Sequence, residues 1–299
     1  MISVVIPLYN KAGQVAQTLR SVLGQTFGRF EVVIVDDGST DGSADEARSV
    51  HDERIRLVSQ QNAGVSAARN RGVAEARYDL IAFLDADDEW KPDYLETQYN
   101  LYCKYPECSI FACNYEFRNA DGRVTPTILR KLPFAGEDGI LSNYFEVACC
   151  SHPPLWTSAV MVRKQALQAV GGFPVGVRSG EDLLTWARLA VKGQIAFSRR
   201  AVVTFMVEGY EVTEKPKRVP AENDVVGREL RRLLKNNAKK GLRQYNSHWH
   251  KMRSSVYMRL GMRCRSIGEA LRGLYFRPLN YKLYVYIIIN LLPNRLKPL

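Results

Sequence analysis

The fold is decided by one stretch of the chain, Leu80-Ile81-Ala82-Phe83-Leu84-Asp85-Ala86-Asp87-Asp88. Its first five residues form a continuous apolar run, which is typical of a strand buried on both faces of a parallel sheet. Four acidic residues then follow within five positions, and such a cluster repels itself unless a cation neutralises it. Carboxylate oxygens suit Mg²⁺ or Mn²⁺. We therefore predict a divalent-metal site held by Asp85 and Asp87; the alternative is a solvated acidic loop.

Toward the N-terminus, short apolar strands alternate with helical patterns. One helix is predicted from Val15, with apolar residues recurring at helical spacing on one face. Another opens at Ser43, where Glu46 completes a capping box, and a third spans residues 65–77. Repeated βα units of this length predict a doubly wound, mostly parallel α/β sheet. Its strands are predicted at residues 3–6, 30–35, 55–58 and 80–84.

Polar residues stand where the other predicted strands end. Pro7 and Tyr9 close the first strand, and Asp36 and Asp37 close the second. Because ligands bind beyond the carboxyl ends of the strands in an open parallel sheet, these residues are predicted to share one crevice with the acidic cluster. A carboxylate there would reach a nucleobase or ribose, and Arg69, on the third helix, would neutralise a pyrophosphate. The alternatives are an Asp-Gly turn and an ordinary surface arginine.

The second half of the chain has a mixed pattern. Strands are predicted at residues 109–117, 159–162 and 195–205, and helices at 164–170 and 182–191. The composition shifts near residue 215, and the remainder predicts basic helices. We place a domain boundary there, between a catalytic domain (1–214) and a basic helical tail (215–299).

Charge is distributed unevenly between these two parts. The 299 residues carry a net charge of +11, but the tail alone has 20 Lys/Arg against 4 Asp/Glu, a net charge of +16. Such a segment binds an anionic membrane or a nucleic acid, or packs on the catalytic domain with a solvated basic face. Its longest apolar run, residues 283–292, is shorter than the ~20 residues that a spanning helix needs. The tyrosines and basic residues around it favour peripheral attachment to an anionic membrane. No nucleic-acid partner is expected, since no nucleic-acid-binding fold accompanies the tail.

The compartment is predicted from two further features. The first residues enter a strand directly, without the basic region of a secretory signal. The six cysteines include no CxxC pair, which favours reduced thiols. We therefore expect a cytoplasmic protein that lies on the inner face of the cell membrane.

Several familiar motifs are absent from the sequence. The first strand is not followed by G-x-G-x-x-G, and no G-x-x-x-x-G-K-[ST], serine nucleophile elbow or HExxH is present. These absences argue against a dinucleotide oxidoreductase, a P-loop mechanism, a serine hydrolase and a zinc protease.

Four motifs occur in order along the chain: VVIPLYN (4–10), VDDGSTD (35–41), NAGVSAARN (62–70) and FLDADD (83–88). Together they resemble the family 2 glycosyltransferases, whose fold is GT-A, a Rossmann-like sheet. Gly180-Glu181-Asp182, followed by Trp186, resembles a fifth motif of that family. The resemblance covers about residues 1–210, and it implies a nucleotide-binding half (1–105) and an acceptor-binding half (106–214).

The resemblance implies inverting transfer of a sugar from a nucleotide diphosphate donor, with a UDP-sugar favoured, to a saccharide hydroxyl. Asp182 is then the general base, and Asp87 with Asp85 holds the metal. The donor is bound by Pro7, Tyr9, Asp36, Asp37, Arg69, Asp85 and Ala86, with Asp37 at the base and Asp85 nearer the ribose. The acceptor is bound by Glu181, Trp156 and His152.

Alternatives to these roles stay open. From the residues alone, Glu181 and Asp182 are acids at a helix N-terminus, where the helix dipole favours them. Trp156 is equally well explained as a buried structural residue.

Two features that the sequence lacks favour one type of transfer reaction over another. Processive synthases of the family carry a Gln-x-x-Arg-Trp motif and membrane-spanning helices, and neither is present, which favours addition of one sugar. The predicted acceptor is lipid-linked, in cell-surface polysaccharide or lipopolysaccharide biosynthesis. Two other readings are a sugar nucleotidyltransferase, whose glycine-rich N-terminal loop is missing, and a non-catalytic module that binds nucleotide sugars or nucleic acid.

Overall fold

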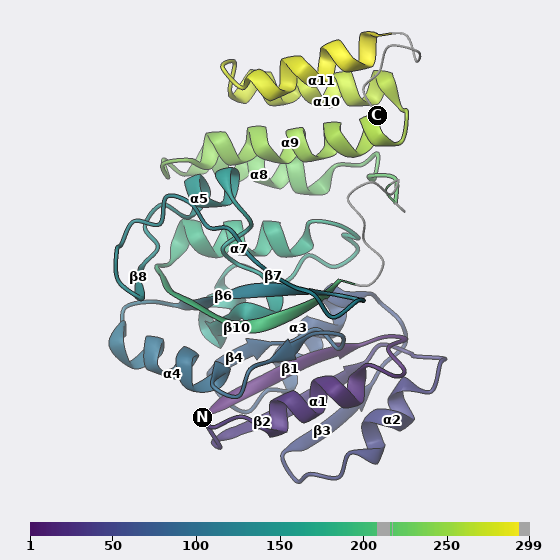
Figure 1. Ribbon diagram of the computed structural model, residues 1–299, viewed down its shortest axis with the longest axis vertical. Coiled ribbons are helices and arrows are strands. Elements are labelled where there is room, and N and C mark those ends of the chain that lie inside the picture. Colours follow the sequence, from purple (N-terminus) through teal and green to yellow (C-terminus); the bar gives the residue numbers. More distant parts are fainter. Residues whose placement is uncertain (208–215, 217, 293–299) are drawn as a thin grey trace.

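The computed structural model describes residues 1–207, 216 and 218–292. Strands of these residues form one mixed sheet in the order β3-β2-β1-β4-β9-β6-β10-β5, with β7 beside β6 and β8 beside β10 (Figure 1). The strands are β1 (Ile2–Leu8), β2 (Phe30–Asp36), β3 (Ile55–Ser59), β4 (Leu80–Phe83), β5 (Glu89–Trp90), β6 (Ile110–Asn119), β7 (Val124–Pro126), β8 (Asp138–Ile140), β9 (Val160–Arg163) and β10 (Ile195–Val207).

Helices cover both faces of this sheet and continue as a stack beyond one of them (Figure 1). They are α1 (Val15–Leu23), α2 (Ser43–Ser49), α3 (Val65–Glu75), α4 (Tyr94–Lys104), α5 (Tyr144–Cys150), α6 (Lys164–Ala169), α7 (Glu181–Lys192), α8 (Val225–Asn236), α9 (Leu242–Arg259), α10 (Arg263–Phe276) and α11 (Tyr281–Leu291), with a 3₁₀ turn at Thr157–Ala159.

The N-terminal half has the predicted parallel α/β arrangement. β1 pairs in parallel with β2 and β4, and β2 pairs in parallel with β3. Every residue of β1 is buried, because successive side chains enter opposite cores: Val4 and Ile6 pack on one face and Val5 on the other. Leu8 lies opposite Asp36, so the first two strands end side by side. β9 runs antiparallel between β4 and β6, which makes the second half of the sheet mixed.

The capping box predicted at Ser43 and Glu46 is wrong. Helix α2 begins after Gly42, whose φ of 89° lies in the left-handed region, and neither Ser43 nor Glu46 caps it; the Asp41 carboxylate accepts from the Ser43 N–H at 3.0 Å. Ser43 instead donates to Asp41, and the Glu46 carboxylate accepts from the Gly13 N–H at 2.7 Å. The Glu46 side chain therefore makes a tertiary contact instead of a cap, and this contact ties α2 to the loop before α1.

The basic tail forms helices, as predicted, and its first part shares the protein core. Val226 and Leu230 of α8 and Leu242, Tyr245 and Trp249 of α9 join the same hydrophobic cluster as α7. Helices α10 and α11 lie farther from the sheet (Figure 1). The boundary placed at 214/215 lies outside the described residues, so the division into two domains stays a prediction.

In the part of the chain that the structure describes, no helix is both long and apolar enough to cross a membrane.

The packing of α3 on β1 gives a test of the fold. A methyl group on Gly72 would lie 2.3 Å from Val5 Cγ1, and Val5 is a stiff β-branched residue of the central strand. We predict that Gly72→Ala lowers the free energy of unfolding by about 1–3 kcal/mol through overpacking. Gly268→Ala in α10, where nothing lies within 4 Å, should instead raise it by up to about 1 kcal/mol. Urea unfolding of both variants checks this, and equal effects would contradict the close contact.

Candidate active site

The site is organised around the guanidinium of Arg69, which is 4% exposed. One of its amino groups lies 2.7 Å from Asp85 Oδ1, just beyond β4, and the other lies 3.4 Å from Glu181 Oε1, at the start of α7. Its central carbon lies 5.2 Å from the centre of the Phe173 ring, within cation–π range. Arg69 thus joins three segments that are far apart in the sequence: it contacts the predicted site residues Asp85 and Glu181, and its charge acts on Asp182, the residue after Glu181.

Asp37 holds the start of α3, the helix that carries Arg69. Its Oδ1 accepts from Gln60 Nε2 at 2.7 Å and from the Ala63 N–H at 2.9 Å, and its Oδ2 accepts from the Gly64 N–H at 2.8 Å. A carboxylate that binds free N–H groups at a helix N-terminus also stabilises the helix dipole. The carboxylate that the resemblance assigns to the nucleobase is therefore engaged within the protein, where it fixes the direction of α3.

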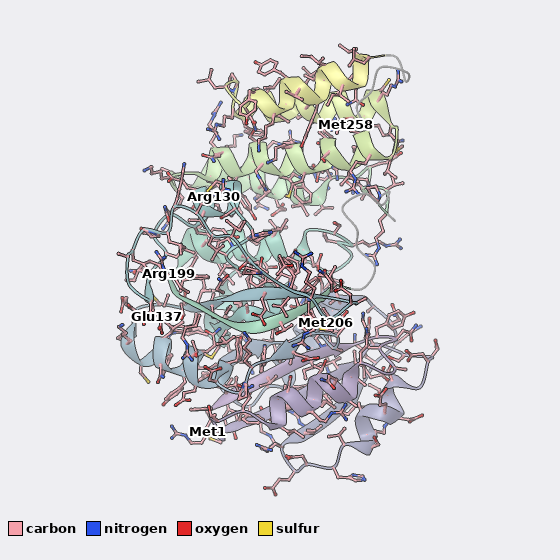
Figure 2. All side chains as sticks on the ribbon, in the orientation of Figure 1. Met1, Arg130, Glu137, Arg199, Met206 and Met258 are labelled. Carbon is pink, nitrogen blue, oxygen red and sulfur yellow. The ribbon has the colours of Figure 1, made fainter. Side chains whose placement is uncertain are left out.

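The acidic cluster after β4 divides into accessible and buried carboxylates. The side chains of Asp85 and Asp87 are 27% and 28% exposed, and Asp87 Oδ2 lies 2.5 Å from Lys11 Nζ. Asp88 is fully buried, where it accepts from Ser158 Oγ and from the Met206 N–H; Met206 is labelled in Figure 2. Burial and the charges of Asp85 and Asp87 raise the pKa of Asp88 well above its usual value.

Asp182 stands at the first turn of α7 beside Glu181. Burial raises its pKa, whereas the Leu183 N–H and the charge of Arg69 act in the opposite direction. Burial and the neighbouring Asp182 also raise the pKa of Glu181, and Arg69 lowers it. Asp182 Oδ1 accepts from the Leu183 N–H at 2.7 Å, which orients the carboxyl group.

A residue of the basic tail packs against the backbone just before α7. Gly180 precedes α7 with a φ of 79°, in the region that favours glycine. A Cβ there would lie 2.6 Å from the Trp249 ring of α9. Trp249 is held by its own hydrogen bond, since its indole N–H donates to Asp224 at 3.1 Å. The segment that presents Glu181 and Asp182 therefore rests on a residue of the basic tail.

The remaining donor-side residues predicted from the sequence lie at or next to the ends of β1, β2 and β4. Pro7 and Ala86 are buried, Asp36 is buried with its carboxylate bonded to the Ser39 N–H, and Tyr9 is exposed at the end of β1. These four occupy the strand ends, as expected.

Trp156 and His152 lie on the acceptor side of the sequence. Trp156 packs on Tyr115 and Phe205, with ring centres 5.4 and 4.8 Å apart. Burial first, and then the charge of Asp182, raise the pKa of Tyr115, the ring on which Trp156 packs. His152 Nδ1 accepts from the Ile128 N–H, and its ring faces Phe117; among the described residues no contact joins it to Asp182.

Sequence reasoning missed several residues that build the site. Lys11, directly after the first motif, pairs with Asp87, and its place next to Tyr9-Asn10 was a signal that could have been used. Asn70 exchanges two hydrogen bonds of 2.8 Å with the backbone of Phe173, which seats that ring beneath Arg69. Trp249 lies in the tail, so no local pattern connects it to Gly180.

The donor atoms of Asp85 and Asp87 fit a hard divalent cation. Both carboxylates are accessible, and a positive charge, the Lys11 ammonium, already sits on Asp87. Among the described residues a second cluster, Asp224, His250 and Glu269, has ligand atoms within 4.8 Å of one another. Glu269 there accepts from His250 and Arg272 and pairs with Arg253, so protein cations already neutralise it. Protein cations contact the strand-end cluster as well, since Lys11 pairs with Asp87 and Arg69 with Asp85.

Two kinds of known sequence match this chain, a protein-family model and individual glycosyltransferases. The model of the family described as "Glycosyl transferase family 2" matches residues 3–168. TuaG of Bacillus subtilis, a glycosyltransferase named for teichuronic acid biosynthesis, is 29% identical over 237 residues, which cover 78% of this chain and 89% of TuaG. An uncharacterised glycosyltransferase of Rickettsia conorii is 32% identical over 198 residues, 65% of this chain but 31% of that protein.

A solved structure has the same fold. The crystal structure of S. aureus TarS 1–349 in complex with UDP-GlcNAc superposes with a TM-score of 0.73 at 18% identity, covering 97% of this chain and 88% of that one.

The buried Arg69 gives a test that depends on pH. Arg69→Met leaves buried or half-buried carboxylates without their cation. Such a change lowers the free energy of unfolding by about 3–5 kcal/mol in similar cases. Removing the positive charge raises the pKa of Glu181 and Asp182 further, so the folded state takes up protons more readily and the loss should shrink as the pH falls from 7 toward 5.

Urea unfolding at several pH values measures the effect. Arg71→Met is the matched control, because Arg71 lies on the same helix and forms an exposed pair with Glu75. It should cost less than about 1 kcal/mol at every pH. A pH-independent loss in Arg69→Met would contradict the electrostatic role.

Proposed function

Because this chain belongs to glycosyl transferase family 2, as its motifs implied, we propose that it is a metal-dependent, inverting glycosyltransferase that adds one sugar to a saccharide acceptor. The observation that carries the proposal is the meeting of Asp85, Glu181 and Asp182 at Arg69, beside the accessible Asp87. One carboxylate poised to take a proton, at the start of α7, and others poised to hold a cation, at the strand ends, are what transfer from a nucleotide diphosphate sugar requires.

Asp182 is proposed as the general base. A sugar hydroxyl is a weak nucleophile, and it gains from a carboxylate that removes its proton as it attacks the anomeric carbon. The Leu183 N–H holds Oδ1, which leaves Oδ2 to accept the proton. Burial raises the pKa of Asp182, so its conjugate acid is weaker and the carboxylate a better base than an ordinary aspartate.

The leaving group is a nucleotide diphosphate, which gains negative charge as the glycosidic bond breaks. Asp85 and Asp87 would hold Mn²⁺ or Mg²⁺, which when bound supplies Lewis-acid stabilisation of that charge. Lys11 and Arg69 bring two positive side chains to the same strand ends. Both therefore favour a diphosphate at this edge of the sheet.

We propose a UDP-sugar as donor and a lipid-linked saccharide in surface-polysaccharide synthesis as acceptor. The TarS structure with UDP-GlcNAc and the name of TuaG support this choice. The tail's charge of +16 supports a cytoplasmic protein attached to the inner face of the membrane, where a lipid-linked acceptor is found by diffusion in two dimensions.

The base is tested by Asp182→Asn. The amide keeps the shape but cannot take the proton, so turnover should fall at least about 10²-fold while donor affinity, measured by calorimetry, changes little. Release of nucleotide diphosphate from a panel of nucleotide sugars gives the rate, with Asp45→Asn on the exposed face of α2 as control. A collapse of donor affinity would place Asp182 in the donor site instead.

The pH profile of the parent gives a second test of the base. The rate should fall as the pH decreases, and the midpoint of that fall should lie at a higher pH than for an unperturbed aspartate, because burial raises the pKa of Asp182.

The metal site is tested by Asp87→Asn. Removing a ligand should abolish Mn²⁺-dependent binding of UDP, followed by calorimetry with and without Mn²⁺, and should abolish transfer. The Lys11–Asp87 pair is partly exposed, so the free energy of unfolding should change by no more than about 1 kcal/mol. Unchanged binding of Mn²⁺ and UDP would remove Asp87 from the metal site.

A further inference from the structure

A basic pocket lies at the far end of the tail, where the turn between α10 and α11 meets α5 and α9. Its volume is about 150 Å³, enough for a small anion together with water. Three cations line it, Lys251 from α9, Arg277 from the turn after α10 and Lys282 from the first turn of α11, along with His248 and Cys149.

None of the three cations has an acidic partner among the described residues. Arg277 and Lys282 are exposed, and Lys251 is half-buried. Glu146, on the adjoining α5, is already paired with Lys240 at 3.3 Å. Elsewhere in the tail some basic side chains have acidic partners: Arg253 and Arg272, for example, both reach Glu269. Unmatched cations at a cavity are costly to hold together, and an anion would relieve that cost.

The electrostatics of the pocket agree with this geometry. Burial first, and then the like charge of Lys282, lower the pKa of Lys251. Burial and the charges of Lys251 and Lys282 lower the pKa of His248 to about 3, so this ring is neutral at physiological pH and keeps one N–H to donate. The pocket therefore offers charged donors and one neutral donor, a set that suits the oxygens of a phosphate.

Exposed apolar side chains surround the mouth of the pocket. Leu279 and Tyr281, which line it, are 90% and 69% exposed, and Tyr275 is 74% exposed. The outer face of α11 continues this surface with Tyr284, Val285 and Ile288, all exposed. Helices α10 and α11 are the elements farthest from the N-terminal half of the sheet (Figure 1). Apolar side chains beside unpaired cations, on a protruding hairpin, match the layered chemistry of a bilayer surface.

We propose that the pocket of Lys251, Arg277 and Lys282 binds the phosphate of an anionic phospholipid headgroup, while the apolar side chains of the α10–α11 hairpin enter the interface. This inference rests on the membrane attachment proposed above and assigns it to one site. It makes attachment depend on where the positive charges lie, and not only on the total charge of the tail.

The test compares two variants with the same change of charge. Lys251→Gln/Lys282→Gln removes two cations from the pocket. The matched control Lys235→Gln/Lys239→Gln removes two exposed lysines, on α8 and just after it, outside the pocket lining. Co-sedimentation is measured with vesicles of phosphatidylcholine containing phosphatidylglycerol. A second set of vesicles takes the same negative charge from oleate, and a third is phosphatidylcholine alone. Thermal unfolding establishes that all three proteins are folded.

The parent should bind the phosphatidylglycerol vesicles, and binding by the pocket variant should be about thirtyfold weaker, the attraction expected of two basic residues at an anionic surface. The control should stay within about threefold of the parent, and oleate vesicles should bind all three proteins weakly. Inorganic phosphate at constant ionic strength should compete with vesicles for the parent.

The contrary outcomes are distinct. Equal losses in the two variants would leave membrane attachment in place and overturn the pocket. Phosphate that binds the parent without displacing it from vesicles would make free phosphate the ligand and overturn the lipid assignment. A parent that binds no anionic vesicle would overturn both the pocket and the attachment, but would leave the transferase assignment untouched, because that is measured with soluble substrates.

Discussion

The burial of one positive charge constrains the whole site. Arg69 is almost inaccessible to water, and a guanidinium in such a place is tolerated only if carboxylates stand close to it on fixed backbone. Asp85 and Glu181 meet that requirement from two different parts of the chain. The two ion pairs therefore tie the strand end that carries Asp85 to the helix that presents Asp182, and the charge of Arg69 holds the pKa of Asp182 below the value that burial alone would give.

The elements around Arg69 are held in turn by hydrogen bonds between polar side chains and backbone groups. Asp37 binds consecutive N–H groups before α3, and Asn70 binds both backbone groups of Phe173. Both residues lie in motifs that read as ligand-binding from sequence. In the structure both side chains bond backbone groups of this chain, Asp37 from just after β2 and Asn70 from within α3, because buried backbone N–H and C=O groups need partners.

The sequence was most informative where local rules govern. The buried strands, their parallel order and the residues at their ends follow from apolar runs and from the geometry of βα units, and they were predicted close to where they lie. The capping box at Ser43 failed because Glu46 has a stronger tertiary partner in the Gly13 N–H. The partner of Asp87, the seat of Phe173 beneath Arg69 and the support of Gly180 by Trp249 depend on residues distant in the chain, and no periodicity encodes such contacts.

The contact of Trp249 with Gly180 bears on how this protein could be recombined with its relatives. A chimera joined at the change in composition near residue 215 would exchange the ring on which the Glu181 turn rests, together with the core residues of α8 and α9. A junction in the turn between α9 and α10 would keep that support and exchange only the outer hairpin. The change in composition near residue 215 therefore does not coincide with the limit of the packed core. A chimera should be joined at the limit of the packed core.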